Sequence, residues 1–527
     1  MKKSVIIFSL AFLLGCGDFL NVTPNKTGAS DIYHMDQLYG LMGQWDLYSR
    51  STGNYWPELI FSGDAVDISP YYYTTVRPSD SPYNNWSWDP EYRKDFNITV
   101  TTWSKWRGIF TCNIVLEKMD HVIQTTPEIR KQVEGEALYG RAFCHFFLAV
   151  QYALWNDDAP GIGYRLNSAP GDIPPRETVK YTFDNIIEDL DNAEKALIEA
   201  GRTKFELQRN FRPTVPTIQA LKARVHLYRG NYSAALENAN AALAGYDYLL
   251  VIKDEPLYKP TFYDIYVLDE TNRHVVDTLK YRIMATMNEL GGAESLSAYP
   301  EFYQPGYTNY YYGNKMVPLS EYYFNLFDHE NDERWKLFYD NNYILYNSAF
   351  AKTVTLEGNT TATAKCFTWE DQQGIKEWHH HAFGRFGTAS SGFYQILGPT
   401  TAEMYLIKAE CLARAGNTAE AANVLRTLRR TRFTTQAVAD NYGGSIQEVL
   451  DERAREMAMV WRFFDIKRLN GAENANIILK RTIMTDRTDM NSAIDIEILP
   501  NDPRWALSIP LEQCILMGWE RNGWEPL

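Results

Sequence analysis

The fold of this chain is decided by two related stretches, LKARVHLYRGNYSAA at residues 221–235 and IKAECLARAGNTAEA at residues 407–421. They align without a gap, and each carries Lys-Ala at its second and third positions and Gly-Asn at its tenth and eleventh. Each has the pattern of a helix, a Gly-Asn turn and a second helix rich in alanine, whose small side chains let the two helices pack closely. This pattern is typical of tetratricopeptide-type repeats, which stack into a superhelix with a wide supporting surface.

Two further segments show the helical spacing of apolar residues. An apolar residue recurs at every fourth position from Leu138 to Phe146, and an apolar stripe runs from Phe183 to Leu197. Thr182 immediately precedes the second stripe, and we expect it to cap that helix. We therefore predict an all-α fold, in which tetratricopeptide-like helical hairpins form a superhelical scaffold.

Residues 50–100 and 250–400 lack helical spacing and are rich in Tyr, Trp, Gly, Pro, Asn and Asp. We expect long loop-rich insertions there, with room for short strands. Long ordered loops on a rigid scaffold are where binding sites usually lie. No Pro/Gly/Ser-rich linker divides the chain, which favours one large domain or an extended helical array.

The start of the chain has the pattern of a bacterial lipoprotein signal. A basic MKK precedes an apolar run at residues 5–14, which is shorter than the roughly 20 residues that a membrane-spanning helix needs. Gly15 precedes Cys16, and a lipoprotein cleavage site requires such a small residue before its cysteine. We expect residues 1–15 to be removed and Cys16 to carry a lipid, so that the protein is anchored to a membrane without crossing it. A plain secretion signal with an incidental cysteine is the alternative.

The chain is acidic, with 52 Lys and Arg against 66 Asp and Glu and a formal net charge of -14. This balance argues against nucleic acid as a partner and against electrostatic adhesion to anionic lipid. The 6 cysteines show no close pairing such as C-x-x-C. Cys144 and Cys411 lie in helical patterns among apolar residues, so we expect buried free thiols and no disulfide framework.

Aromatic residues make up 14% of the chain. Tyr and Trp combine a flat apolar face with a polar edge, which suits sugar rings and peptides alike. They gather in the loop-rich segments, beside Arg and Asp side chains that can bind hydroxyl groups. The predicted ligand contacts are Tyr72, Tyr73, Arg77, Asp80, Trp86, Trp88, Tyr307, Tyr311, Tyr312 and Trp378. For each of them the alternative is that the side chain anchors a long loop to the helical scaffold.

Two clusters of carboxylates raise the question of catalysis, because a glycosidase needs a pair of them roughly 5–9.5 Å apart. The first spans residues 328–333 and is followed by Arg334, which favours a turn or helix terminus held by ion pairs. The second, at residues 451–456, alternates in charge along a helical pattern, which predicts pairs within the helix. No G-x-S-x-G, H-E-x-x-H or Walker-type motif occurs, and we predict that the protein is not an enzyme.

The run His379-His380-His381 invites a metal site. Neighbouring side chains diverge on a strand or a helix, so three adjacent histidines do not easily converge on one ion. We expect a loop without metal there and no required cofactor.

Several short motifs follow one another along the chain. They are CGDFL at residues 16–20, Trp106 with Asn113, EA and RAF within 136–143, AEMYLIKAE at 402–410, DERARE at 451–456, RFFDIKR at 462–468, and IP with NGW within 509–524. In this order they resemble the SusD/RagB family of outer-membrane lipoproteins of Bacteroidetes-type bacteria. The chain departs from the family in having Thr400 where an Arg is frequent, and Gly523 directly after Asn522 without the usual Pro. Neither departure touches the anchor or the repeats.

The resemblance implies a single SusD-like domain over residues 16–527, with an N-terminal part at 16–250, a loop-rich insertion at 251–399 and a C-terminal part at 400–527. It also implies a lipid-anchored protein on the outer leaflet of the outer membrane. Because the family includes calcium-binding members, the resemblance leaves open a structural calcium ion held by scattered carboxylates, with no ligands nominated. Such a protein captures an oligosaccharide and hands it to a SusC-like TonB-dependent transporter. The alternatives are an oligopeptide ligand in the same role, an enzyme that degrades glycans or peptides, and an adhesin or structural protein without a small ligand.

Overall fold

Helices dominate the chain, as predicted. The computed structural model describes residues 32–43, 57–67, 86–88, 105–169, 171–252, 261–268, 274–283, 301, 307–310, 317–340, 351–356, 360–365, 381–382, 393–396, 398–457, 459–484, 492–509 and 511–522. The helices are α2 (Met35–Met42), α3 (Pro57–Ser62), α7 (Lys105–Lys118), α8 (Pro127–Tyr152), α9 (Val179–Glu199), α10 (Val215–Tyr228), α11 (Tyr232–Gly245), α13 (Glu321–Asn325), α14 (Glu333–Phe338), α15 (Thr401–Arg414), α16 (Thr418–Arg429), α17 (Gln436–Asp440), α18 (Ile446–Glu456), α19 (Val460–Glu473) and α20 (Leu511–Met517). Among the residues just given, no helix is both long and apolar enough to cross a membrane.

Both predicted hairpins are present, as α10 with α11 and as α15 with α16. Between the helices of each pair stands a glycine in the left-handed region, Gly230 with a φ of 75° and Gly416 with a φ of 82°. Only glycine enters this region readily, because it has no Cβ. The amides of Asn231 and Asn417 each donate back to a carbonyl oxygen in the last turn of the preceding helix, both at 2.9 Å. The Gly-Asn pair therefore ends one helix and starts the next.

Replacing Gly416 with alanine is expected to lower the free energy of unfolding by about 1–2 kcal/mol, because a side chain strains the left-handed backbone. Space is not the cause, since a Cβ at Gly416 would meet nothing within 4 Å. Gly171 offers a matched control, because a Cβ there also meets nothing within 4 Å and its φ is ordinary. Urea denaturation of the two variants measures the difference, and equal stabilities would contradict the assigned turn geometry.

A third hairpin, α8 with α9, precedes the two predicted ones. The helix-start prediction for α9 is wrong by one turn: Thr178 caps it, with its side chain accepting from the amide of Tyr181 at 3.1 Å. Thr182 lies inside the helix, and its hydroxyl bonds the backbone of Ile162 instead, donating to the carbonyl at 3.0 Å and accepting from the amide at 3.2 Å. A threonine in the first turn of a helix can thus serve a neighbouring loop rather than the helix end.

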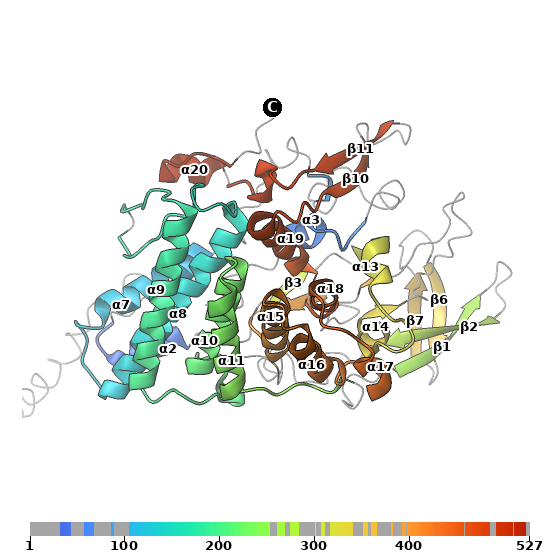
Figure 1. The fold of residues 1–527 in the computed structure, drawn as a ribbon, viewed down its shortest axis with the longest axis horizontal. Helices are drawn as coiled ribbons and strands as arrows, with labels where there is room; N and C mark the ends of the chain where they lie inside the picture. Colours follow the sequence, from blue (N-terminus) through green and yellow to red (C-terminus); the bar gives the residue numbers. More distant parts are fainter. Residues whose placement is uncertain are drawn as a thin grey trace, which may run out of the picture.

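The hairpins stack in chain order, with α8 against α9, α9 against α10, α10 against α11, α11 against α15 and α15 against α16. Figure 1 shows this row running across the molecule from α8 and α9 to α16, with α7 covering the outer side of α8. The contact of α11 with α15 joins parts of the chain that more than 150 residues separate. The helical scaffold is therefore continuous, and the segment between these two helices is an insertion into it.

Short strands occupy parts of that insertion, and one further pair follows α19. The strands are β1 (Thr261–Leu268), β2 (His274–Ile283), β3 (Tyr307–Tyr310), β4 (Val317–Pro318), β5 (Tyr339–Asp340), β6 (Ala351–Leu356), β7 (Thr360–Lys365), β8 (His381–Ala382), β9 (Phe393–Ile396), β10 (Leu479–Met484) and β11 (Ala493–Ile498). They form a four-stranded sheet of order β2-β1-β6-β7, a three-stranded sheet of order β4-β8-β5 and the pairs β3-β9 and β10-β11. The four-stranded sheet lies at the end of the molecule opposite to α8 and α9 (Figure 1). The fold is thus mostly helical with short strands, as predicted.

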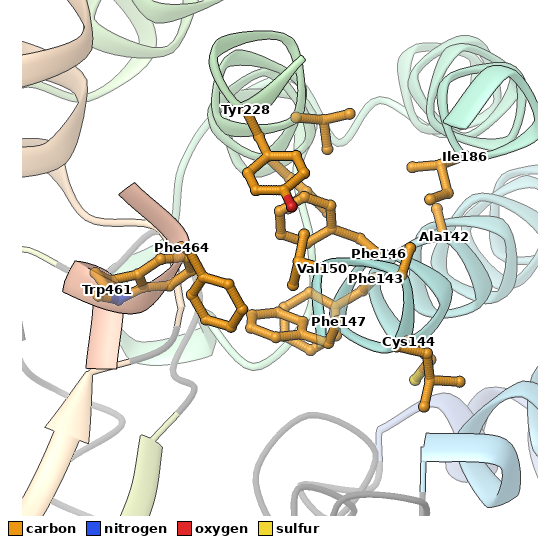
Figure 2. Close-up of a cluster of buried hydrophobic side chains, with 14 of the residues drawn as sticks. Ala142, Phe143, Cys144, Phe146, Phe147, Val150, Ile186, Tyr228, Trp461 and Phe464 are labelled. Atoms are coloured by element: carbon orange, nitrogen blue, oxygen red, sulfur yellow. The ribbon is translucent and has the colours of Figure 1, made fainter. Parts of the chain in front are cut away.

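The core consists of aromatic side chains around α8 and of mostly small side chains where the hairpins cross. Figure 2 shows Phe146 of α8 next to Tyr228 of α10, and Phe147 facing Trp461 and Phe464 of α19. The ring centroids of Phe147 and Trp461 are 6.3 Å apart, and those of Phe146 and Tyr228 are 6.2 Å apart. A second buried cluster lies between α10, α11 and α15 and comprises Ala220, Ala223, Leu227, Ala235, Ala239, Ala242, Met404, Ile407 and Cys411. Its alanines allow the close crossing that the sequence predicts.

Candidate ligand-binding site

Among the predicted ligand contacts, the described side chains are those of Trp86 and Trp88. Tyr307 lies in β3, where its backbone pairs with Ile396 of β9. The other predicted contacts, with the predicted lipidation site, lie outside the described residues: Tyr72, Tyr73, Arg77, Asp80, Tyr311, Tyr312, Trp378 and Cys16.

Trp86 and Trp88 are core residues, with exposed fractions of 1% and 0%. Trp88 packs edge-on against Trp505, with ring centroids 4.8 Å apart, and its indole N–H donates to the carbonyl oxygen of Ser62 at 3.3 Å. A ring enclosed by the core has no face left for a sugar. This corrects the prediction for these two residues, and the alternative, that they anchor a loop to the scaffold, describes them.

Two arginines from the C-terminal part hold this short segment in place. Arg481 donates to the carbonyl oxygen of Trp86 at 3.3 Å, and Arg504 donates to that of Trp88 at 2.8 Å. Trp88 has a φ of 53°, a left-handed conformation that bulky residues rarely adopt. Such a backbone costs on the order of 1–3 kcal/mol and persists only where the surroundings impose it. The surrounding structure therefore holds the backbone of residues 86–88 in place.

The carboxylates of residues 328–333 form a turn held by hydrogen bonds and ion pairs, as predicted. The Asp328 carboxylate accepts from the amides of Glu330 and Asn331 at 3.2 and 3.1 Å. Slight burial acts to raise the pKa of Asp328, but the bonds from Asn331 and Glu330 hold it below its usual value. Asp332 pairs with Arg334 at 2.9 and 2.7 Å. Local hydrogen bonds and ion pairs therefore account for this cluster.

The charges at residues 451–456 pair mainly between helices, which corrects the prediction of pairs within the helix. At the centre is the buried carboxylate of Glu452, which lies 2.8 Å from Arg334, 2.6 Å from Arg429 and 2.9 Å from Arg455. Of these partners only Arg455 belongs to the same helix, α18. Burial acts to raise the pKa of Glu452, but the three guanidinium groups hold it well below its usual range.

A second set of buried ion pairs links α10, α15, α18 and α19. The pairs are Arg224–Glu403, Arg453–Asp465, Arg468–Asp465 and Arg468–Glu410, with N to O distances of 2.9, 2.9, 2.8 and 2.7 Å. Burial acts to raise the pKa of Glu410 and of Asp465, but the neighbouring arginines keep both below their usual values. These carboxylates stay ionised and bound, so they hold helices together.

Acid catalysis would need a carboxylic acid that keeps its proton near neutral pH. The pKa of Glu136 is raised, chiefly by burial, while Arg212 opposes the rise. Its side chain is fully buried, 2.6 Å from Arg212 and 2.7 Å from Gln132, and a substrate cannot reach it. The arrangement of these groups suits a rigid binding scaffold rather than a catalytic centre.

His145 is a buried, neutral side chain stacked on Tyr164, with ring centroids 3.9 Å apart. The amide of Arg165 donates to its Nε2 at 3.1 Å, so the proton sits on Nδ1, which bonds the carbonyl oxygen of Arg141 at 2.9 Å. Burial lowers the pKa of His145 to about 3, although the Arg141 carbonyl opposes this.

The stability of the fold is expected to fall as the pH drops from 6.5 toward 3. The unfolded chain protonates His145 below its ordinary pKa of 6.5, whereas the folded state takes up that proton only near pH 3. His145→Gln removes this titration and is expected to reduce the slope of the free energy of unfolding with pH between pH 5 and 6.5, above the range of ordinary carboxylates. Urea denaturation at several pH values measures the profile. The exposed His121 is the control, since His121→Gln is expected to retain the wild-type slope.

The cysteine prediction is confirmed for the residues that the structure describes. Cys144 and Cys411 are buried free thiols, as predicted, and Cys112 and Cys514 share that state. In the described part of the chain, no cluster of three or more His, Cys, Asp or Glu could hold a metal ion. Of the histidine run, His381 lies in β8, and the other two lie outside the described residues.

Exposed aromatic side chains occur at positions that the sequence prediction did not select. They are Tyr33, Phe110, Tyr181, Tyr248 and Tyr322. Tyr248 stands out because it belongs to the run Tyr-Asp-Tyr that directly follows the alanine-rich helix α11. In the sequence, Tyr248 is marked by two aromatic residues that are separated by one polar residue and directly follow the end of a helix.

Two protein-family models match the chain. Residues 60–227 match a family described as starch-binding and associating with the outer membrane. Residues 264–495 match the SusD family. The matched ranges contain α7 to α9 and β2 to β10 in full and parts of α3 and α10, and thus most of the scaffold and of the insertion.

Individual proteins match over nearly the full length. A SusD-like protein of Formosa agariphila is 23% identical over 501 residues, which are 89% of this chain and 91% of that protein. The solved structure of surface glycan-binding protein A from Bacteroides uniformis has a TM-score of 0.58 at 13% identity, covering 93% of this chain and 100% of that one. That of a laminarin-binding SusD-like protein has a TM-score of 0.54 at 14% identity, covering 93% and 99%. These structures show that the fold is shared.

Proposed function

Because this chain belongs to the SusD family, we propose that it binds an oligosaccharide at the surface of the outer membrane and delivers it to a SusC-like TonB-dependent transporter. The observation that carries the proposal is the match of residues 60–227 to a family described as starch-binding and associating with the outer membrane. The names of two structurally similar proteins, one glycan-binding and one laminarin-binding, support a carbohydrate ligand. Starch and laminarin are both neutral glucans, so a neutral glucan is the ligand class to test first.

The proposal includes a lipid at Cys16 as the link to the membrane. The basic start, the short apolar run and Gly15 before the cysteine support it. An acidic chain gains little from electrostatic adhesion to anionic lipid, so a lipid chain is the more effective anchor. Mass spectrometry of the N-terminal peptide from native membranes tests this part by itself.

Binding without catalysis is the second element of the proposal. The carboxylates of the two acidic clusters form a turn and a set of buried ion pairs, and those of Asp332 and Glu452 are already engaged by arginines. A binding protein needs a rigid surface that loses little freedom when the ligand arrives. The stacked hairpins, held together by buried charges, suit that role.

No cofactor is needed for the proposed binding. A structural calcium ion remains a prediction, and the binding assay below tests it when it is run with calcium chloride and with EDTA. Equal affinities in both would count against a calcium ion that orders the binding site.

The test is calorimetry of the full chain in detergent with maltohexaose, laminarihexaose and a mixed-sequence hexapeptide. We expect one of the two glucan oligosaccharides to bind and to be recovered unhydrolysed after incubation. Binding of the peptide alone would keep the family role and overturn the ligand class. Hydrolysed sugar would overturn the proposal that the protein is not an enzyme.

Co-purification of the transporter with the tagged chain from native membranes tests the partner, and an untagged strain is the control.

A further inference from the structure

A row of three aromatic rings lies where the chain leaves the hairpin of α10 and α11. Phe205, from the loop before α10, packs on Tyr246 with ring centroids 4.2 Å apart. Tyr246 is followed in the row by Tyr248, whose ring is 6.4 Å away at an interplanar angle of 23°. Tyr248 ends the row and is 43% exposed, whereas the other two rings are half-buried.

The row results from local backbone geometry. Tyr246 has an extended backbone, with a φ of -167° and a ψ of 122°. In an extended segment alternate side chains share a side, so Tyr246 and Tyr248 point the same way and Asp247 points away from them. The spacing along one side brings the two rings into a near-parallel arrangement.

The backbone that carries the rings is held at several points. The amide of Tyr246 donates to Ala242 of α11 at 2.9 Å, and the hydroxyl of Thr401 donates to the carbonyl oxygen of Tyr248 at 2.6 Å. Farther along, the amide of Leu250 donates to Glu301 at 2.8 Å. An exposed ring on such a backbone is ordered before any ligand binds, which reduces the entropy that binding costs.

We propose that Phe205, Tyr246 and Tyr248 form a sugar-binding platform that contacts a neutral oligosaccharide, a site that rests on the carbohydrate-binding function proposed above. A pyranose ring presents a flat face of C–H groups, which packs well on an ordered aromatic ring. Tyrosine adds a hydroxyl at the ring edge for the sugar hydroxyls. Burial, with help from the nearby Tyr248, Glu301 and Asp247, raises the pKa of Tyr246 to about 12, so its phenol remains a proton donor at neutral pH.

A protein or lipid partner fits this platform less well. The exposed side chains of α20 include three aliphatic ones, those of Leu511, Ile515 and Leu516, which form the kind of surface that apolar partners cover. The platform consists of rings alone, and its neighbours in sequence, Lys204 and Asp247, are exposed and charged. Flat rings with polar edges beside charged groups are typical of carbohydrate recognition.

The test compares three variants of the full chain in detergent by calorimetry with maltohexaose and laminarihexaose. Tyr248→Ala is expected to weaken binding of the glucan that the wild type prefers by about tenfold. Tyr248→Phe keeps the ring and is expected to stay within about twofold of wild type. Tyr181→Ala is the matched control, because Tyr181 is also 43% exposed but lies on α9, and it is expected to leave the affinity unchanged. The melting temperature of each variant checks that it folds.

The results of this test distinguish an error in the proposed platform from an error in the proposed carbohydrate-binding function. Wild-type binding that Tyr248→Ala leaves within about twofold would overturn the platform and keep the carbohydrate-binding function. An equal loss in Tyr181→Ala would also overturn it, since the effect would then not belong to this site. If the wild type binds neither glucan, the ligand class proposed above and the platform both fall.

Discussion

Glu452→Gln is expected to lower the free energy of unfolding by about 3–5 kcal/mol, because removing one partner of a buried ion pair leaves the others uncompensated. Here the substitution removes the negative charge that binds Arg334, Arg429 and Arg455, which all lie within 2.9 Å of the Glu452 carboxylate. Glutamine keeps the shape of the side chain and an oxygen acceptor, so the change isolates the charge. Against the 5–15 kcal/mol of a typical domain this is a large fraction.

Urea denaturation followed by circular dichroism measures the effect, with Asp440→Asn as the control. Asp440 forms a partly exposed pair with Arg430 at 2.7 Å, and we expect no change in the unfolding midpoint from its loss. If Glu452→Gln were as stable as Asp440→Asn, the buried charges would not contribute to the fold in the way proposed. Should Glu452→Gln fail to fold, Arg429→Lys provides a milder change at the same cluster, since lysine retains the charge but not the planar fork.

Phe147→Ala is expected to cost about 3–5 kcal/mol, the usual range for deleting a buried phenylalanine ring. Phe147 is fully buried, its ring lies 4.7 Å from that of Phe143, and it also contacts Trp461 of α19 (Figure 2). Removing it opens a cavity between α8 and α19, which belong to opposite ends of the chain. The surrounding aromatic rings are large and rigid, so they cannot collapse into the space.

The same denaturation experiment tests this expectation, with Phe147→Leu and Ile515→Ala beside it. Leucine fills part of the cavity and should cost less than alanine. Ile515 is 74% exposed, so its truncation is expected to change the free energy of unfolding by less than about 0.5 kcal/mol. A Phe147→Ala protein as stable as Ile515→Ala would mean that the aromatic cluster is not the core of the domain.

The helical scaffold could be predicted because its signals are local. Gly230 and Gly416 occupy equivalent places in two aligned stretches, and each terminates its helix through its own backbone conformation. The alanines beside them indicate a close helix crossing, and that crossing is the buried cluster between α10, α11 and α15. Local signals do not fix the residue at which a helix begins. Thr178 and Thr182 are both good capping residues, and only the position of the loop with Ile162 decides which of them caps α9.

The ion pairs could not be predicted, because their partners are far apart in the sequence. Alternating charges at residues 451–456 are compatible with pairs inside a helix or with pairs to other helices. Glu452 is bound by Arg334 and Arg429 because α14, α16 and α18 meet, which is a property of the tertiary structure. The burial of Trp86 and Trp88 has the same origin, since the core that encloses them includes Trp505.

The buried position of the charge pairs has a consequence for the medium in which the protein can work. Dissolved ions screen charges at the surface over about 8–10 Å at physiological ionic strength, but they act far less on charges inside the protein. The Glu452 cluster and the pairs of Arg468 are enclosed, so fresh, brackish and saline surroundings should leave the scaffold equally intact. A protein that stands outside the cell, as we propose for this one, is exposed directly to the ionic strength of the medium, and the burial of these charges makes its scaffold insensitive to that ionic strength.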